Sequence, residues 1–173
     1  MSISIKEITN WIGSLPDVHG DVPSSFTDLV LELGNAHGDG WLFWPATTPI
    51  WDERKNIAKA KDAGAAAVVV DREWAAQNGS LDLPMIVVNE VPYELLKRTV
   101  VAKRDSFGGA VIAVSGSAGK TTTRELIAAF LRGAGQVHST NENSNSGGGQ
   151  CTTLLQAPAI AKYIVSEVGI FGP

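Results

Sequence analysis

Hydrophobic positions along the chain follow two periodicities in turn, and this predicts alternating strands and helices. Short apolar runs bounded by polar residues, Gly or Pro are typical of strands, whereas apolar residues three or four positions apart are typical of helices. The predicted strands are Trp41–Trp44, Ala66–Val70, Met85–Val88, Val111–Val114, a brief one near Val137, and Tyr163–Val168. The predicted helices are Ile5–Ile12, Asp52–Ala63, Val91–Arg104, Thr121–Arg132 and one from about Thr152. This alternation favours an α/β fold with largely parallel sheets.

The same pattern predicts which side chains point inward. Helical spacing turns Leu95, Leu96, Val100 and Val101 toward the core. Trp41 and Trp44 alternate about a short strand, so that one of them could face a substrate groove. Burial in the core is the plainer interpretation of these tryptophans, because aromatic rings bury large areas.

A polar break at Arg104–Gly109 separates two segments of the pattern. We place a domain boundary there, with a small N-terminal α/β domain over residues 1–106 and a second domain over residues 107–173. The second segment holds only three predicted strands, and a parallel sheet of three strands leaves an edge and a face uncovered. The sequence therefore predicts an incomplete parallel-sheet domain, either cut in mid-domain or completed by a partner chain.

The segment Val111–Thr123 reads as an apolar strand, a loop of small residues, and a lysine followed by three threonines. Glycines let backbone N–H groups close around phosphate oxygens, and a helix N-terminus favours a bound anion. Lys120 would reach the terminal phosphates, and the Thr121 hydroxyl would bind Mg²⁺. The candidate nucleotide-binding residues are Gly116, Ser117, Ala118, Gly119, Lys120, Thr121 and Thr122. The segment predicts a protein that uses a nucleoside triphosphate.

A plainer interpretation of this segment stays open. The generic phosphate-loop pattern has an early glycine where this chain has Val114, and an ordinary strand-to-helix turn with a solvated Lys120 would share much of the pattern. Thr122 is as consistent with helix capping as with a phosphate contact. The strand before the loop and the helix after it favour phosphate binding.

Composition narrows the class of protein further. The chain has 173 residues, 44% of them hydrophobic, and its net charge of −4 argues against a dedicated nucleic-acid-binding protein. The single cysteine, Cys151, fits a reducing compartment, and the three histidines are too scattered for a metal cluster. The first residues lack the features of a signal peptide, and no apolar stretch is long enough to span a membrane. We therefore expect a cytoplasmic protein without a nucleic-acid or membrane partner.

Three segments together resemble the Mur ligase family, the ATP-dependent enzymes that join amino acids or peptides to cell-wall precursors. Ala113–Thr123 is similar to the family's phosphate loop, Thr140–Leu155 to its Asn-rich loop, and Ile164–Gly169 to the strand whose glutamate helps to hold magnesium. More loosely, Gly38–Phe43 followed by Asn56–Val70 looks like part of the family's precursor-binding domain. The resemblance implies a role in peptidoglycan, and hence cell-wall, biogenesis.

The resemblance also implies a chemistry, an ATP-dependent carboxylate–amine ligation. In the family the substrate carboxylate attacks the γ-phosphate of ATP, and an amine displaces the resulting acyl phosphate. Lys120 and Glu167 would be the catalytic residues, and Thr121 and Glu167 would hold Mg²⁺. Asn143 and Asn145 would orient the substrate, a small-molecule or nucleotide-linked carboxylate. On the residues alone, Glu167 could instead be a solvated carboxylate, and the two asparagines part of an ordinary polar loop.

Departures from the family pattern leave several alternatives open. The stretch Leu31–Asn35 lacks the Asp-Ser-Arg through which the family contacts a uridine nucleotide, and the family's C-terminal domain is absent from this sequence. The leading hypothesis is thus a fragment or half of a Mur-type ligase that needs a missing C-terminal region or a partner chain. The alternative is a non-catalytic binding or scaffold module that forms a homodimer. A GTPase is disfavoured because no guanine-reading Asn-Lys-x-Asp run is present, and a phosphate-loop kinase because the sequence leaves no room for a kinase lid.

Overall fold

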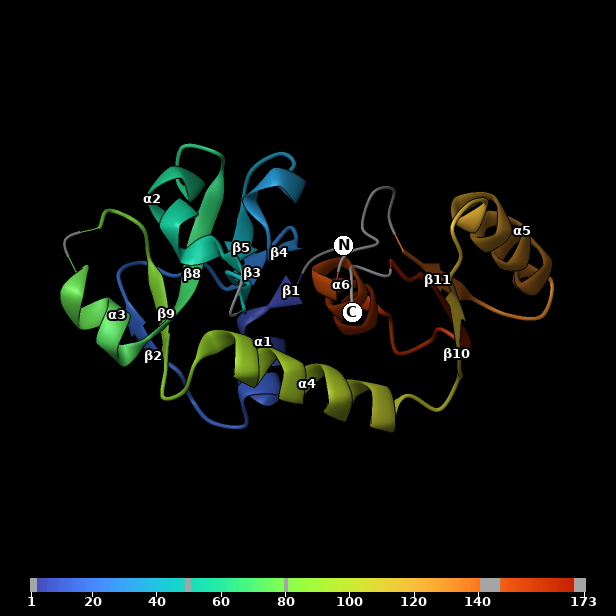
Figure 1. Ribbon diagram of the computed structural model, residues 1–173. Coiled ribbons are helices and arrows are strands. Elements are labelled where there is room, and N and C mark those ends of the chain that lie inside the picture. The colour runs from blue at the N-terminus through green and yellow to red at the C-terminus, as the bar shows by residue number, and fades with distance from the viewer. Residues whose placement is uncertain (1–2, 49–50, 80, 141–146, 170–173) are drawn as a thin grey trace. The chain divides into compact units, whose positions relative to one another are not determined.

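The computed structural model describes residues 3–48, 51–79, 81–140 and 147–169 (Figure 1). The chain divides into two compact units, an N-terminal unit of Met1–Thr99 and a C-terminal unit of Val100–Pro173. Each unit combines helices with a sheet that is wholly or mostly parallel, so the predicted α/β fold is confirmed. In the described part of the chain, no helix is long and apolar enough to cross a lipid bilayer.

The N-terminal unit contains a five-stranded sheet in the order β2-β9-β8-β5-β4. Its strands are β2 (Asp17–His19), β4 (Leu29–Val30), β5 (Trp41–Phe43), β8 (Ala65–Asp71) and β9 (Met85–Val88). Only β2 runs antiparallel to its neighbour; the other strands are parallel. Two small antiparallel pairs accompany the sheet, β1 (Ile3–Ser4) with β3 (Ser25–Phe26), and β6 (Thr47–Thr48) with β7 (Trp51–Asp52).

The core of the N-terminal unit is built on the apolar runs that the sequence pattern identified. All of β9 is buried, as are Val68, Val69 and Val70 of β8. Trp41 and Trp44 are both fully buried, and the Trp44 indole Nε1 donates a hydrogen bond of 2.8 Å to the carbonyl oxygen of Pro92. Neither tryptophan lines a groove, because large rings gain most by removing their whole surface from water.

Three helices of six or more residues begin in the described part of the N-terminal unit, and the last of them continues into the C-terminal unit. The predicted α1 (Ile5–Ile12) is confirmed, with a capping box formed by Ser4 and Glu7. A second helix, α3 (Arg72–Gln77), was not predicted, and it begins where Asp71 accepts a hydrogen bond from Trp74 N. The third, α4 (Pro92–Ser106), buries Leu95 and Leu96 as predicted. Val101, which was also expected inward, is 59% exposed.

Of the helix predicted over Asp52–Ala63, only the four residues Ile57–Ala60 are α-helical, and residues 61–64 form a turn. After β7 the chain forms a 3₁₀ segment, Glu53–Asn56, and only then the short α-helix α2 (Ile57–Ala60). The Asp52 carboxylate accepts a hydrogen bond of 2.9 Å from Arg54 N. It also forms an ion pair of 2.8 Å with the Arg54 guanidinium. The buried Glu53 carboxylate accepts a bond from the backbone of Leu33. These contacts over so short a stretch favour the tighter 3₁₀ turn.

The C-terminal unit contains a parallel sheet in the order β10-β12-β11. Its strands are β10 (Ala110–Val114), β11 (Val137–Ser139) and β12 (Tyr163–Glu167), and its helices are α5 (Lys120–Arg132) and α6 (Gly147–Gln156). Figure 1 shows α5 and α6 on opposite sides of this sheet, and four of the five residues of β12 are buried. The α5 face packs Ala128 against Val114 and Val165.

Helix α6 begins about five residues earlier than the sequence pattern predicted, at Gly147 rather than near Thr152. Glycine is a poor helix former, so a run of three glycines ordinarily predicts a loop. Here the carbonyl oxygen of Gly149 accepts hydrogen bonds from the hydroxyl groups of Thr152 at 3.0 Å and Thr153 at 2.7 Å. These bonds help to hold the glycine-rich first turn.

Candidate nucleotide-binding site

The loop Ser115–Gly119 connects the end of β10 to the start of α5, and all of its residues are exposed. Gly119, immediately before the helix, has a left-handed backbone with φ 73° and ψ 5°. Side chains with a Cβ rarely adopt this conformation, which explains a glycine at this place. The first N–H groups of a helix have no intrahelical partner, so those of α5 are available for an anion at the loop.

Lys120 curls back over the loop that precedes it. Its ammonium group donates a hydrogen bond of 2.8 Å to the carbonyl oxygen of Gly116. A cation placed over a loop of backbone N–H groups suits a polyphosphate, because both attract phosphate oxygens. Of the other predicted loop residues, Ser117 and Ala118 lie exposed beside Gly119, and Thr122 is exposed in the first turn of α5.

Thr121 and Glu167 meet at the carboxyl edge of the sheet. The Thr121 hydroxyl donates a hydrogen bond of 2.9 Å to the Glu167 carboxylate, whose residue is only 6% exposed. The register of the sheet produces this contact, because Val114 at the end of β10 pairs with Glu167 at the end of β12. A hydroxyl and a carboxylate are the oxygen ligands that Mg²⁺ prefers, so these two predicted residues are suited to a magnesium ion.

Two buried residues behind Glu167 were not identified from the sequence. Arg124 is 2% exposed and donates a hydrogen bond of 2.6 Å to the carbonyl oxygen of Thr140. The Thr140 hydroxyl in turn accepts one of 3.0 Å from Glu167 N. A signal for Arg124 was present in the sequence, since it lies three residues after Thr121 and hence on the same side of the helix. Thr140 begins the segment that resembles the Asn-rich loop, but nothing in the sequence indicated that it contacts Glu167.

The asparagines of the predicted site, Asn143 and Asn145, lie outside the described residues. Among the residues that are described, no group of three or more His, Cys, Asp or Glu side chains could hold a metal ion. Burial lowers the pKa of the His138 imidazole from its usual 6.5 and raises the pKa of the Cys151 thiol from its usual 9.0. Both groups are therefore favoured in their neutral forms.

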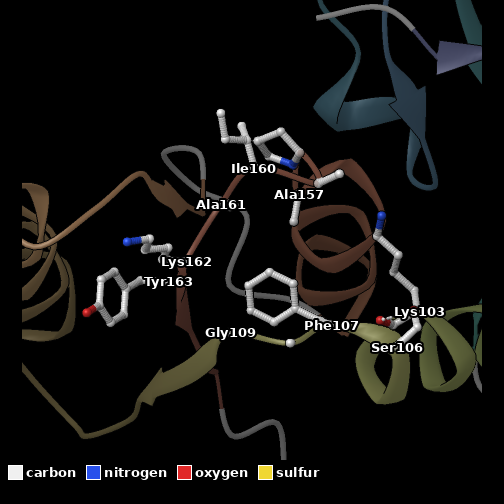
Figure 2. A pocket seen from close by; sticks show the side chains of 12 residues that line it. Lys103, Ser106, Phe107, Gly109, Ala157, Ile160, Ala161, Lys162 and Tyr163 are labelled. Carbon is white, nitrogen blue, oxygen red and sulfur yellow. Dashed lines mark hydrogen bonds between the residues drawn. The ribbon is translucent and has the colours of Figure 1, made fainter.

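A cavity of about 650 Å³ opens at the opposite edge of the same sheet, where β10 and β12 begin. Figure 2 shows Phe107 near Lys103 and Ser106 of α4, with Ile160 and Ala157 across from them. Lys162 and Tyr163 extend away from the Phe107 ring in this view. Because nucleotides bind at the carboxyl ends of parallel strands, this cavity is separate from the phosphate loop.

A smaller cavity of about 340 Å³ lies in the N-terminal unit, beyond the ends of β8 and β9. Arg98 in its lining donates hydrogen bonds of 3.0 and 2.7 Å to the Glu90 carboxylate. Arg72 donates one of 2.7 Å to the side-chain oxygen of Asn89. Both arginines of this cavity are thus already bonded within the unit.

The fold and the loop together define an α/β protein of the phosphate-loop class. Residues 114–173 match the family described as Mur ligase middle domain. The UDP-N-acetylmuramoyl-tripeptide–D-alanyl-D-alanine ligase of Synechocystis is 34% identical over 133 residues, which are 77% of this chain and 29% of that protein. The chain belongs to the Mur ligase family, as the three sequence segments predicted.

Solved structures agree with this assignment. A crystal structure of MurF from Acinetobacter baumannii aligns with 98% of this chain and with 36% of the MurF chain, with a TM-score of 0.69. The two sequences are 20% identical, so this match supports the fold alone. The MurF ligase of Thermotoga maritima in complex with ADP is 26% identical, with a TM-score of 0.53, over 81% of this chain and 31% of its own. The chain spans roughly a third of the length of these relatives.

Proposed function

We propose that this chain carries the ATP-binding part of an ATP-dependent carboxylate–amine ligase of the Mur type, which acts through an acyl phosphate. The observation that carries the proposal is the contact of 2.9 Å between the Thr121 hydroxyl and the Glu167 carboxylate, beside a glycine loop and Lys120. These groups together suit a nucleotide phosphate with its magnesium ion. The ADP bound by the MurF ligase of Thermotoga maritima supports the same assignment.

Each residue of the site has a role in this proposal. Backbone N–H groups of Gly116–Gly119 would bind the phosphate oxygens, and Thr122 would add a further phosphate contact. Lys120 would neutralise charge on the terminal phosphates. Thr121 and Glu167 would hold Mg²⁺, which supplies further neutralisation of the phosphate charge when bound. Since the Thr121 hydroxyl gives its hydrogen to Glu167, the lone pairs of its oxygen are directed elsewhere and suit the cation.

We assign the precursor-binding function to residues 1–106 and the partial ATP-binding domain to residues 107–173. The carboxylate substrate is a small molecule or a nucleotide-linked one, and Asn143 and Asn145 are proposed to orient it. The relatives' names support a cell-wall precursor and an amine partner. On this proposal the chain works in the cytoplasm, with Mg²⁺ and with a further C-terminal region or a partner chain.

A non-catalytic module, dimeric through its sheet, is the second candidate. Two observations favour it. Strand β10 lies at the edge of its sheet in the described residues, and the α5 side chains Leu126 and Phe130 are 56% and 83% exposed. A strand edge and an apolar helix face can both be covered by a second copy. Such a module would have no need of a nucleotide.

A thermal-shift measurement separates the two candidates. ATP with Mg²⁺ is expected to raise the melting temperature of the wild-type chain, because a ligand that binds only the folded state stabilises it. Lys120→Ala should remove this shift, whereas the control Lys162→Ala, an exposed lysine at the amino end of β12, should keep it. A folded wild-type chain whose melting temperature does not respond to the nucleotide would favour the scaffold. Phosphate release only on addition of a C-terminal partner chain would support the ligase.

A further inference from the structure

A continuous set of hydrogen bonds lies behind the phosphate loop. Thr121 Oγ1 donates to the Glu167 carboxylate at 2.9 Å, and Glu167 N donates to Thr140 Oγ1 at 3.0 Å. Arg124 Nη1 donates to the Thr140 carbonyl oxygen at 2.6 Å. Because Thr121 and Arg124 are one turn apart on α5, these bonds close a ring through α5 and the carboxyl ends of β11 and β12.

The members of this ring are shielded from water, with Arg124 2%, Thr140 3% and Glu167 6% exposed. A buried guanidinium or carboxylate is stable only where other groups satisfy it, so the positions of these side chains are tightly constrained. Thr140 is held on a further side, since its backbone N–H donates to Val165 O at 3.1 Å. Its hydroxyl oxygen therefore has a fixed place beside Glu167 N.

We infer that Thr140 is a positioning residue for the magnesium site, and that Arg124 holds Thr140 in place. By accepting the Glu167 N–H, the Thr140 hydroxyl fixes the backbone of Glu167 and so directs its carboxylate at Thr121. Groups that orient a metal-binding carboxylate in this way govern metal affinity without touching the ion. This inference rests on the proposed function, that the loop binds a nucleotide with Mg²⁺.

If Thr140 positions the magnesium site, its loss should change the effect of Mg²⁺ on nucleotide binding. If Thr140 only stabilises the fold, its loss should leave the effect of Mg²⁺ unchanged. ADP is titrated into the chain with Mg²⁺ and, separately, with excess EDTA, and the ratio of the two affinities gives the gain due to the metal. Thr140→Val keeps the shape but removes the hydroxyl, and the metal-dependent gain should fall about tenfold while the affinity without metal stays unchanged. Thr140→Ser restores the hydroxyl and should restore the gain.

Two further variants sharpen the comparison. Thr153→Val is the matched control, because Thr153 is also buried in the C-terminal unit but its hydroxyl donates within α6 to Gly149. It should leave the metal-dependent gain as in the wild type. Arg124→Gln keeps Thr140 and removes the charged donor to its carbonyl together with the ion pair to Glu125, which lies outside the ring, so a smaller loss of the gain is expected. If Thr140→Val does not fold, the metal-dependent gain in ADP affinity is measured with Arg124→Gln instead.

A double-mutant cycle with Glu167→Gln asks whether Thr140 acts through Glu167. In the Glu167→Gln background, adding Thr140→Val should lower the metal-dependent gain no further. Additive losses would overturn the inference, and so would a full gain in both Thr140→Val and Arg124→Gln. A wild-type chain that binds no ADP would refute the proposed function itself, and the inference with it.

Discussion

The Thr121 hydroxyl and the Glu167 carboxylate are 2.9 Å apart, although the two residues are separated by 46 positions in the sequence. Parallel pairing of β10 with β12 places the residue after the phosphate loop next to the end of the neighbouring strand. This is the point at which a divalent cation and a phosphate would meet. The contact joins the two motifs that the sequence resemblance had identified separately.

Removal of the Thr121 hydroxyl should weaken magnesium-dependent nucleotide binding. Thr121→Val preserves the branched shape but deletes the hydroxyl that contacts Glu167. Thr121 is also a proposed Mg²⁺ ligand, and the loss of a group that orients a metal ligand costs about ten- to a hundredfold in metal affinity, so a loss of at least this size in affinity for ADP with Mg²⁺ is expected. Isothermal titration calorimetry would measure it. Thr121→Ser, which retains the hydroxyl, should bind nearly as the wild type does; equal losses in both variants would contradict the role of this hydroxyl.

Gly119→Ala should lower the stability of the C-terminal unit by about 1 kcal/mol. No neighbouring atom would meet the added methyl group, so the effect comes from the backbone angle φ of 73° alone. Denaturant unfolding monitored by circular dichroism gives the change in free energy. Gly108→Ala is the control, since that position is equally open and its φ is not positive. If the two substitutions were equivalent, backbone strain at Gly119 would not explain the glycine.

Stability should decline as the pH falls below about 6.5, through His138. Burial lowers the pKa of its imidazole in the folded state, so the unfolded chain takes up the proton first as the pH drops. The free energy of unfolding therefore decreases from pH 6.5 downward and levels off below the folded-state pKa. Melting curves at pH 7.5 and pH 5.5 should differ less for His138→Gln than for the wild type. His19 and His37 remain in both proteins, so the difference isolates His138.

Trp44→Phe should destabilise the N-terminal unit by about 1–3 kcal/mol. The smaller ring still fills most of the site, but the Pro92 carbonyl oxygen loses the indole donor at 2.8 Å in a buried setting. Urea unfolding followed by far-ultraviolet circular dichroism measures the change. Trp74→Phe, at a partly buried residue of α3, should have a smaller effect. A larger loss of unfolding free energy for Trp74→Phe than for Trp44→Phe would show that the buried hydrogen bond is not the main source of the destabilisation.

The sequence pattern predicted the longer strands whose residues are apolar and contiguous, although it missed the buried two-residue strand β4 (Leu29–Val30). The strands β8, β9 and β12 consist almost entirely of buried residues, so a run of hydrophobic letters marks them directly. Strand β2 was not predicted, because all three of its residues, Asp17–His19, are exposed at the sheet edge. Its place depends on antiparallel pairing with β9, which is a contact between distant residues and leaves no periodicity in the sequence.

The candidate site divides in a similar way. The phosphate loop, Lys120 and Thr121 are local, and one short segment of sequence contains them all. Glu167 required the family resemblance, because a glutamate at a strand end is commonly solvated. The roles of Arg124 and Thr140 depend on their burial and on the hydrogen bond between them, which arise from contacts between distant residues. An arginine in an amphipathic helix is ordinarily expected at the surface. The spacing from Thr121 places Arg124 on the same side of the helix, but its burial is evident only in the folded chain.

The edge position of β10 has a consequence for handling the protein. Along its outer side, the backbone amides and carbonyls face no other strand in the residues that the structure describes. An extended peptide from another molecule can add to such a border, and concentrated samples are therefore prone to associate through it. Ala113, exposed on this strand, offers a site for a lysine that would repel an incoming strand and keep preparations monodisperse.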